Sequence, residues 1–203
     1  MSRSRIIRAI QVATVIVSLT GGAARADVSL GASFGYTHLS YPDLPNFSND
    51  VVGIPGTQTW GQPGLRVGYL APNGRWDVNA DIGLVHRSGT IGNDERSVQL
   101  LPQIQANLGP RDGINPFING GVGIIHERAS TSATSSITAT RPVFGAGIGL
   151  KKSVSEGHGL VRVELRYDRV SESVKELSPT ATFTFPATNL FSVKLGFDLL
   201  VAR

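Results

Sequence analysis

The sequence contains no cysteine, and its only methionine is Met1. Without cysteine the chain can form no disulfide, no thiolate metal site and no cysteine nucleophile. Charged residues make up only 17% of the chain, whereas a soluble domain usually carries about a quarter. The 24 glycines, together with abundant Ser and Thr, favour an all-β chain with frequent turns over a helical one.

Residues 1–26 have the three parts of a secretory signal peptide. Three arginines lie within the first eight residues, residues 9–19 are mainly apolar, and Ala24-Arg25-Ala26 has the small-x-small pattern of a cleavage site. The apolar part is too short to cross about 30 Å of hydrocarbon as a helix. We therefore predict an exported protein that is cleaved after Ala26, leaving residues 27–203 as one mature domain.

Removal of the signal peptide changes the charge of the chain. The leader holds four of the 19 basic residues and none of the 15 acidic ones, so the mature chain has 15 of each. A formally neutral chain gives no support to nucleic-acid binding. The four histidines lack metal-ligand spacing, and the sequence shows no phosphate-cradling loop. We expect no nucleic-acid partner, no metal and no cofactor.

The mature chain alternates between apolar and small or polar residues. No segment approaches 18 consecutive apolar residues, which excludes helical membrane spans. In residues 28–36 every even position is apolar and every odd one is small or polar. Side chains alternate faces along a strand, so each such segment predicts a strand with one apolar face. Seven further segments alternate in the same way: 64–69, 76–84, 97–108, 118–124, 144–150, 161–168 and 191–199.

Short and long connections alternate between these eight segments. Short links fall near 71–75, 109–115 and 152–158, and longer ones near 38–58, 127–141 and 169–187, with an intermediate one near 88–96. This order predicts an eight-stranded antiparallel up-and-down transmembrane β-barrel with both termini at the short-turn end.

Two local features carry further expectations. Pro102 removes a hydrogen-bond donor from its strand, so we expect a β-bulge there. Residues 180–185 continue the alternation of the last strand, with Phe183 and Phe185 on the outward parity. We predict that part of this hairpin projects above the membrane as a sheet edge that could bind partners by strand addition.

The polar face decides whether the apolar face points into the barrel or out of it. Eight-stranded barrels occur in water with apolar interiors and in lipid with apolar exteriors. Here the polar face is rich in glycine, and its ionisable residues number five of each sign. A narrow interior needs small residues and paired charges, so we predict a charge-plugged lumen rather than an open pore. These residues are Arg66, Lys151, Arg162, Arg166 and Lys194, with Asp77, Asp81, Glu164, Asp168 and Asp198.

The positions of the strands around the ring predict which charges meet. The third strand lies across from the seventh, so we expect Asp77 and Asp81 to face Arg162 and Arg166. Five further arginines end different strands at the long-loop rim, where we predict contacts with lipopolysaccharide phosphates, for which guanidinium geometry is suited. Ordinary solvated loop charges are the alternative. The five are Arg87, Arg96, Arg128, Arg141 and Arg169.

Three segments resemble the small outer-membrane β-barrel proteins of the OmpX and OmpA type. They are the Pro-aromatic-Gly-rich run 115–123, the segment Leu165-Arg166-Tyr167-Asp168, and the last strand, similar to the signal read by the barrel-assembly machinery. The resemblance covers residues 27–203 and implies an outer-membrane location, contact with that machinery, and roles in adhesion or envelope integrity through an extracellular protein ligand. The assembly-signal positions are Lys194, Gly196, Leu199 and Val201.

Two other functions stay open. His86-Arg87-Ser88-Gly89 faintly resembles the His-x-Ser-Asn motif of PagL-type lipid A deacylases, with Asp94 or Glu95 as the acid. In the present chain, however, Gly89 replaces Asn and the motif lies on the third strand. A soluble, lipocalin-like periplasmic binder is the other alternative. The leading prediction is a structural or surface-interaction barrel that is not an enzyme.

The signal-peptide prediction can be tested by mass spectrometry. We expect protein purified from the envelope to begin at Asp27, because signal peptidase accepts the pattern that ends at Ala26. An Ala26→Leu variant should keep its leader, since it removes the small residue beside the cleavage site. An intact mass that includes residues 1–26 in the unaltered protein would contradict the prediction.

Overall fold

The computed structural model describes residues 27–42, 48–53, 64–88, 94–110, 113–130, 136–178 and 181–202, and these are almost all in β-strands. Within these ranges no helix is long and apolar enough to cross a membrane. The signal peptide lies outside the described residues and stays a prediction. The barrel strands are β1 (Asp27–Ser40), β3 (Gly64–Leu70), β4 (Trp76–Ser88), β5 (Asp94–Asn107), β6 (Ile114–Ser130), β7 (Ser136–Val154), β8 (Gly159–Val170) and β11 (Thr188–Ala202).

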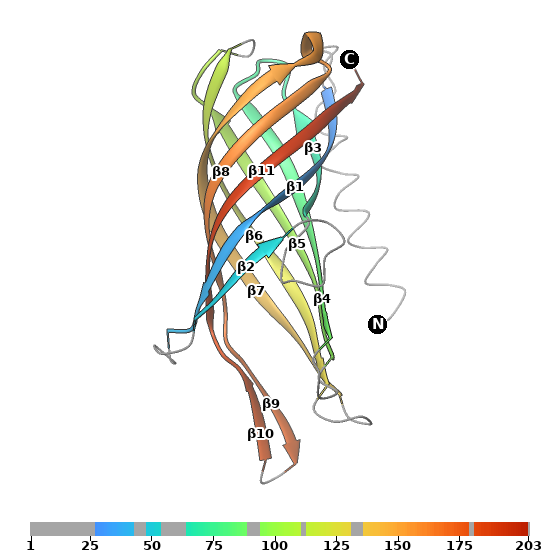
Figure 1. The fold of residues 1–203 in the computed structure, drawn as a ribbon, viewed down its shortest axis with the longest axis vertical. Coiled ribbons are helices and arrows are strands. Elements are labelled where there is room, and N and C mark those ends of the chain that lie inside the picture. The colour runs from blue at the N-terminus through green and yellow to red at the C-terminus, as the bar shows by residue number, and fades with distance from the viewer. Residues whose placement is uncertain are drawn as a thin grey trace.

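Backbone pairing closes these eight strands into a ring. The order is β11-β8-β7-β6-β5-β4-β3-β1, every pair is antiparallel, and β1 also pairs with β11 (Figure 1). Each strand corresponds to one of the eight segments that the alternation predicts, with β5 ending one residue before its segment, so the predicted strand number and topology are confirmed. Figure 1 shows the C-terminus at the same end as the short β3–β4 and β7–β8 connections.

A ninth strand, β2 (Ser48–Gly53), shares a side of β1 with β3. β2 pairs with residues 35–40 of β1, and β3 pairs with residues 27–33 of the same strand. The two strands therefore follow one another along β1, β3 towards the short-turn end and β2 towards the long-loop end.

The side chains sort between the two faces of the barrel as the alternation predicts. Along β8, Arg162, Glu164, Arg166 and Asp168 are buried, while the apolar residues between them are exposed. The exposed large hydrophobic residues are spread over all eight barrel strands. This is the reverse of a soluble barrel with an apolar interior, and the lipocalin-like alternative is therefore wrong.

Several segments predicted as loops are strands. β6 runs to Ser130 and β7 begins at Ser136, so most of 127–141 extends the barrel wall. With 17 and 19 residues, these strands exceed the roughly 9–11 residues that cross a bilayer. Within 169–187, β9 (Ser173–Ser178) and β10 (Ala181–Phe185) form a separate two-stranded sheet that projects beyond the barrel end opposite the C-terminus (Figure 1).

The structure changes two of the local expectations. Phe185 is buried against Ile137 and Ala139 of β7 instead of pointing outward, because β10 belongs to its own sheet and Pro186 and Ala187 separate it from β11. The side chain of Phe183 lies outside the described residues. Pro102 needs no bulge: pairing between β5 and β6 stops after Leu100 and resumes at Gln103 in the same register.

The apolar exterior predicts how charges on it behave. Val122, on the outer face of β6, is 70% exposed, and we expect Val122→Arg to lose about 2–4 kcal/mol in a bilayer because the charge would enter hydrocarbon. Ser136→Arg, at the exposed start of β7, is the matched control and should cost little. Unfolding in lipid vesicles measures both. Equal stabilities for the two variants would count against a lipid-facing belt.

Candidate functional site

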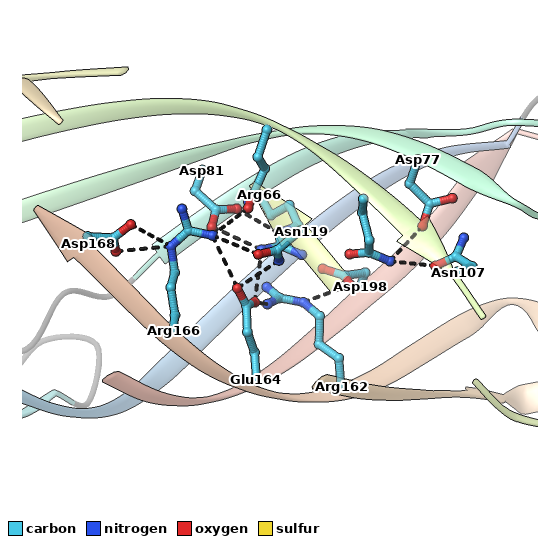
Figure 2. A network of polar contacts seen from close by, with 12 residues as sticks. Arg66, Asp77, Asp81, Asn107, Asn119, Arg162, Glu164, Arg166, Asp168 and Asp198 are labelled. Atoms are coloured by element: carbon cyan, nitrogen blue, oxygen red, sulfur yellow. Dashed lines mark hydrogen bonds and ion pairs between the residues drawn. The ribbon is translucent and has the colours of Figure 1, made fainter. Parts of the chain in front are cut away.

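A network of ion pairs centred on Glu164 fills the middle of the lumen. The Glu164 side chain is 0% exposed. Its carboxylate accepts from Arg66 at 3.2 Å, Arg162 at 3.1 Å and Arg166 at 3.3 Å, and from the amide of Asn119 at 2.8 Å (Figure 2). A buried carboxylate is tolerated only when its lone pairs find such partners.

Each of the three arginines also holds a second acid. Arg66 binds Asp81 of β4 with two bonds of 2.6 and 3.0 Å. Arg162 donates to Asp198 of β11 at 3.1 Å, and Arg166 binds both oxygens of Asp168 on its own strand at 2.8 and 2.9 Å. The network therefore joins β3, β4, β8 and β11 through alternating charges (Figure 2).

A second polar cluster lies towards the short-turn end. Lys151 of β7 forms an ion pair with Asp77 of β4. Gln105 donates to Asp77 at 2.9 Å and to Asn107 at 2.8 Å, and Asn107 donates in turn to the backbone oxygen of Gly74 in the short β3–β4 turn. These bonds connect the lumen to that turn.

Lys194 has a different position from the other lumen cations. It is half-buried, and among the described residues it has no hydrogen bond or ion pair.

The partners differ from those predicted from strand position. Neither Asp77 nor Asp81 pairs with Arg162 or Arg166; Asp77 meets Lys151 and Asp81 meets Arg66. The prediction considered only the order of the strands around the ring. Because the strands are tilted, residues on opposite strands lie at different heights along the barrel axis. Arg66 and Asp81 are instead direct cross-strand neighbours in register.

Glycines on the lumen side leave room for these charged side chains. A Cβ on Gly145 would lie 1.8 Å from Oδ1 of Asp168, and one on Gly196 would lie 2.5 Å from Cζ of Arg162. The carboxylate and the guanidinium thus occupy space that a side chain on the neighbouring strand would fill.

A layer of apolar side chains inside the barrel was not predicted from the sequence. It is buried, and it lies between the charged network and the long-loop end of the strands. Adjacent pairs of apolar residues in the sequence, such as Leu100-Leu101 and Ile124-Ile125, were the available signal, since one member of each pair breaks the alternation. The layer consists of Leu101, Ile125, Val143, Val170 and Leu190.

Arg141 lies beyond this layer and points into the barrel, which contradicts its predicted role as a lipopolysaccharide contact. It is 5% exposed. It donates to Glu127 at 2.8 Å and to the backbone oxygen of Pro186 at 2.7 Å, and its guanidinium lies 5.7 Å from the ring centre of Phe185. The prediction failed because 141 has the lumen-facing parity of β7.

Arg96, Arg128 and Arg169 lie on the outward parity of their strands. Arg96 of β5 and Arg128 of β6 are exposed and directly opposite one another in register. Arg169 is half-buried and donates to Oδ1 of Asn189 at 2.5 Å. Arg87 is on β4, but its side chain lies outside the described residues.

The deacylase-like motif lies at the end of β4. The backbones of Ser88 and Asp94 are paired, as are those of Arg87 and Glu95, so both candidate acids are on the adjacent strand. The side chains of His86 and Ser88 lie outside the described residues. In the part of the chain that the structure describes, no three His, Asp or Glu side chains are grouped so as to hold a metal ion.

Comparison with known proteins relates this geometry to solved structures. No protein-family model matches the sequence, and no curated relative is found by sequence. Neisserial surface protein A matches with a TM-score of 0.63 at 10% identity, covering 86% of this chain and 98% of that one. The outer membrane protein AlkL matches with a TM-score of 0.52 at 15% identity, covering 89% and 91%. The chain has the fold of the small outer-membrane β-barrels.

The four positions predicted to form an assembly signal lie on both faces of β11. Lys194 and Gly196 face the lumen, and Leu199 and Val201 face outward with exposures of 53% and 61%. β11 is also the strand that closes the ring with β1.

Loss of the central carboxylate should destabilise the barrel. Glu164→Gln leaves three buried arginines with one charge fewer to balance them, and breaking a buried pair costs about 3–5 kcal/mol. Glu172→Gln, at an exposed position, is the control and should leave stability unchanged. Denaturant unfolding in micelles measures both. A Glu164→Gln barrel as stable as the control would show that the network contributes little.

The Lys151–Asp77 pair allows a double-mutant cycle. Lys151→Met alone leaves a buried carboxylate without its cation, whereas the double variant Lys151→Met/Asp77→Asn removes both charges. We expect the double variant to be more stable than Lys151→Met by at least about 1 kcal/mol, because an uncompensated buried charge is worse than none. Additive losses in the cycle would contradict direct coupling.

Proposed function

We propose that this chain is an exported outer-membrane β-barrel with a closed lumen, which supports the envelope and displays its long-loop end for adhesion or another interaction. Its signal peptide is removed, and residues 27–203 form the barrel. The observation that carries the proposal is the inverted arrangement of the side chains: ion-paired residues fill the centre, and apolar residues cover the outside of all eight strands. Such a surface is stable in lipid and unstable in water.

Two layers support a closed lumen. The network around Glu164 occupies the middle, and the apolar layer that includes Leu101 and Val143 lies on its long-loop side. An eight-stranded ring leaves room only for side chains, and an apolar constriction resists wetting. The barrel therefore acts as a wall rather than as a porin.

The surface at the long-loop end offers the features of an interaction site. β6 and β7 extend beyond the length needed to cross a bilayer, and the β9–β10 hairpin projects further still (Figure 1). Packing of Phe185 against Ile137, Ala139 and Arg141 fixes the base of the hairpin. An extracellular protein is the ligand that this extended surface suits best.

The outward rim arginines suit a phosphate of lipopolysaccharide. Arg96 and Arg128 face each other across neighbouring strands. A phosphate between them would match the geometry of both guanidinium groups. Arg169, also on the outward parity, extends the same proposal to β8, whereas Arg141 has no part in it.

The last strand carries the signal for assembly: β11 is read by the barrel-assembly machinery through Lys194, Gly196, Leu199 and Val201. The role is not catalytic, because the buried ionisable side chains are bound to one another rather than directed at a substrate.

Fractionation and conductance together test the proposed function. The full-length gene product should appear in the outer-membrane fraction and migrate differently on gels before and after heating, because a closed barrel resists detergent. The purified barrel in a planar bilayer should show no steady conductance, since both layers block the lumen. Monodisperse protein in buffer without detergent would overturn the membrane location, and a stable open channel would overturn the closed lumen.

A further inference from the structure

A groove crosses the outer, lipid-facing surface of the barrel. Its volume is about 660 Å³, within the range of about 300–1,000 Å³ that ligand sites have. Residues that line it belong to six neighbouring strands, from Trp76 on β4 to Phe191 on β11, and most of them are exposed apolar residues of the outward parity. The groove is therefore separate from the charged lumen.

Small residues make the floor of the groove. Gly120 of β6 and Ala146 of β7 are cross-strand neighbours, and Ala106 lies nearby on β5. Larger residues lie on both sides, including Ile104, which is paired with Gly120. A Cβ on Gly120 would have no atom closer than 3.7 Å, so the glycine is not required by crowding there.

The groove runs obliquely from one end of the barrel towards the other. It begins at Trp76, which follows the short β3–β4 turn, and ends at Tyr167 and Phe191, towards the long-loop ends of β8 and β11. Five steps between strands, at about 4.8 Å each, give a length of about 24 Å. One leaflet of hydrocarbon is about 15 Å deep, so an inclined acyl chain can follow the groove for most of its length.

Polar groups gather at the long-loop end of the groove. Asn189 accepts from the hydroxyl of Tyr167 at 2.9 Å and from Arg169 at 2.5 Å. A guanidinium has five N–H donors, and among the described residues this bond is the only one that Arg169 makes. The remaining donors are available at this end of the groove, which the proposed function places at the outer surface of the membrane. An apolar groove that ends at a cation matches a lipid with an anionic head.

We propose that this groove binds one acyl chain of a lipid A-type phosphoglycolipid, whose phosphate is held by Arg169. The proposal rests on the proposed function, which places the long-loop end at the outer leaflet. Lipid tails are as apolar as leucine, so the gain comes from close packing over Gly120 and Ala146 and from a charge-assisted bond at Arg169. This contact is distinct from the one at Arg96 and Arg128, which lie on other strands.

Binding of lipid A to the purified full barrel tests the proposal. The probe is lipid A added to barrels in detergent micelles, and native mass spectrometry gives the bound fraction. Gly120→Leu/Ala146→Leu replaces the small residues of the groove floor with large ones and should weaken binding by about tenfold or more, as should Arg169→Gln. The controls are Ala32→Leu, an exposed small residue on β1, and Lys152→Gln, an exposed cation at the short-turn end; both should bind as the unaltered barrel does.

The remaining outcomes separate this site from the proposed function. If the Gly120→Leu/Ala146→Leu variant binds lipid A as well as the unaltered barrel does, the groove is not the binding site. If only Arg96→Gln/Arg128→Gln loses binding, the groove is again excluded, and the contact at the rim is supported instead. If the barrel binds phosphatidylglycerol as well as lipid A, and the groove and Arg169 variants lose both lipids equally, the site does not select a phosphoglycolipid. Gel shifts on heating verify that every variant is folded, so that lost binding reports the site.

Discussion

Closure of the β1–β11 ladder is the constraint on which the rest of the structure depends. In hydrocarbon no water can satisfy an exposed sheet edge, so every backbone donor and acceptor must find a partner within the sheet. Antiparallel pairing all around the ring meets that requirement. It also defines an inside and an outside, and each strand must then supply one face for lipid and the other for a narrow interior.

The narrow interior explains why charges and glycines occur together. Arginines and acids fit there only as pairs, because an unpaired charge in a confined space is costly. Their side chains need space, which glycines such as Gly145 and Gly196 leave on the neighbouring wall. Beyond the charged network the interior becomes apolar at Leu101, Ile125 and Val143. The lumen is thus filled by two different kinds of packing, and each of them favours a closed barrel.

The outer surface divides into a belt and a rim with different chemistry. The belt is apolar, and its small residues at Gly120 and Ala146 form the groove. The rim holds exposed cations, with Arg96 and Arg128 facing each other. Beyond the rim, long strands and the β9–β10 hairpin extend the wall away from the membrane. The three regions suit hydrocarbon, anionic headgroups and a protein ligand, respectively.

The sequence by itself determined the strands and their faces, because the period-two pattern assigns every residue of a strand to one side. Two predictions from the sequence were incorrect or incomplete. Arg141 was assigned to the outer rim although it has the lumen-facing parity of β7, and the buried apolar layer was missed although pairs such as Leu100-Leu101 place one member inside the barrel. Only the tertiary structure decided which charges meet, since strand tilt sets the height of Asp77 against Lys151 and of Glu164 against Arg66. It alone also brought Gly120 beside Ala146, because a groove across strands depends on register, and register is fixed when the ring closes.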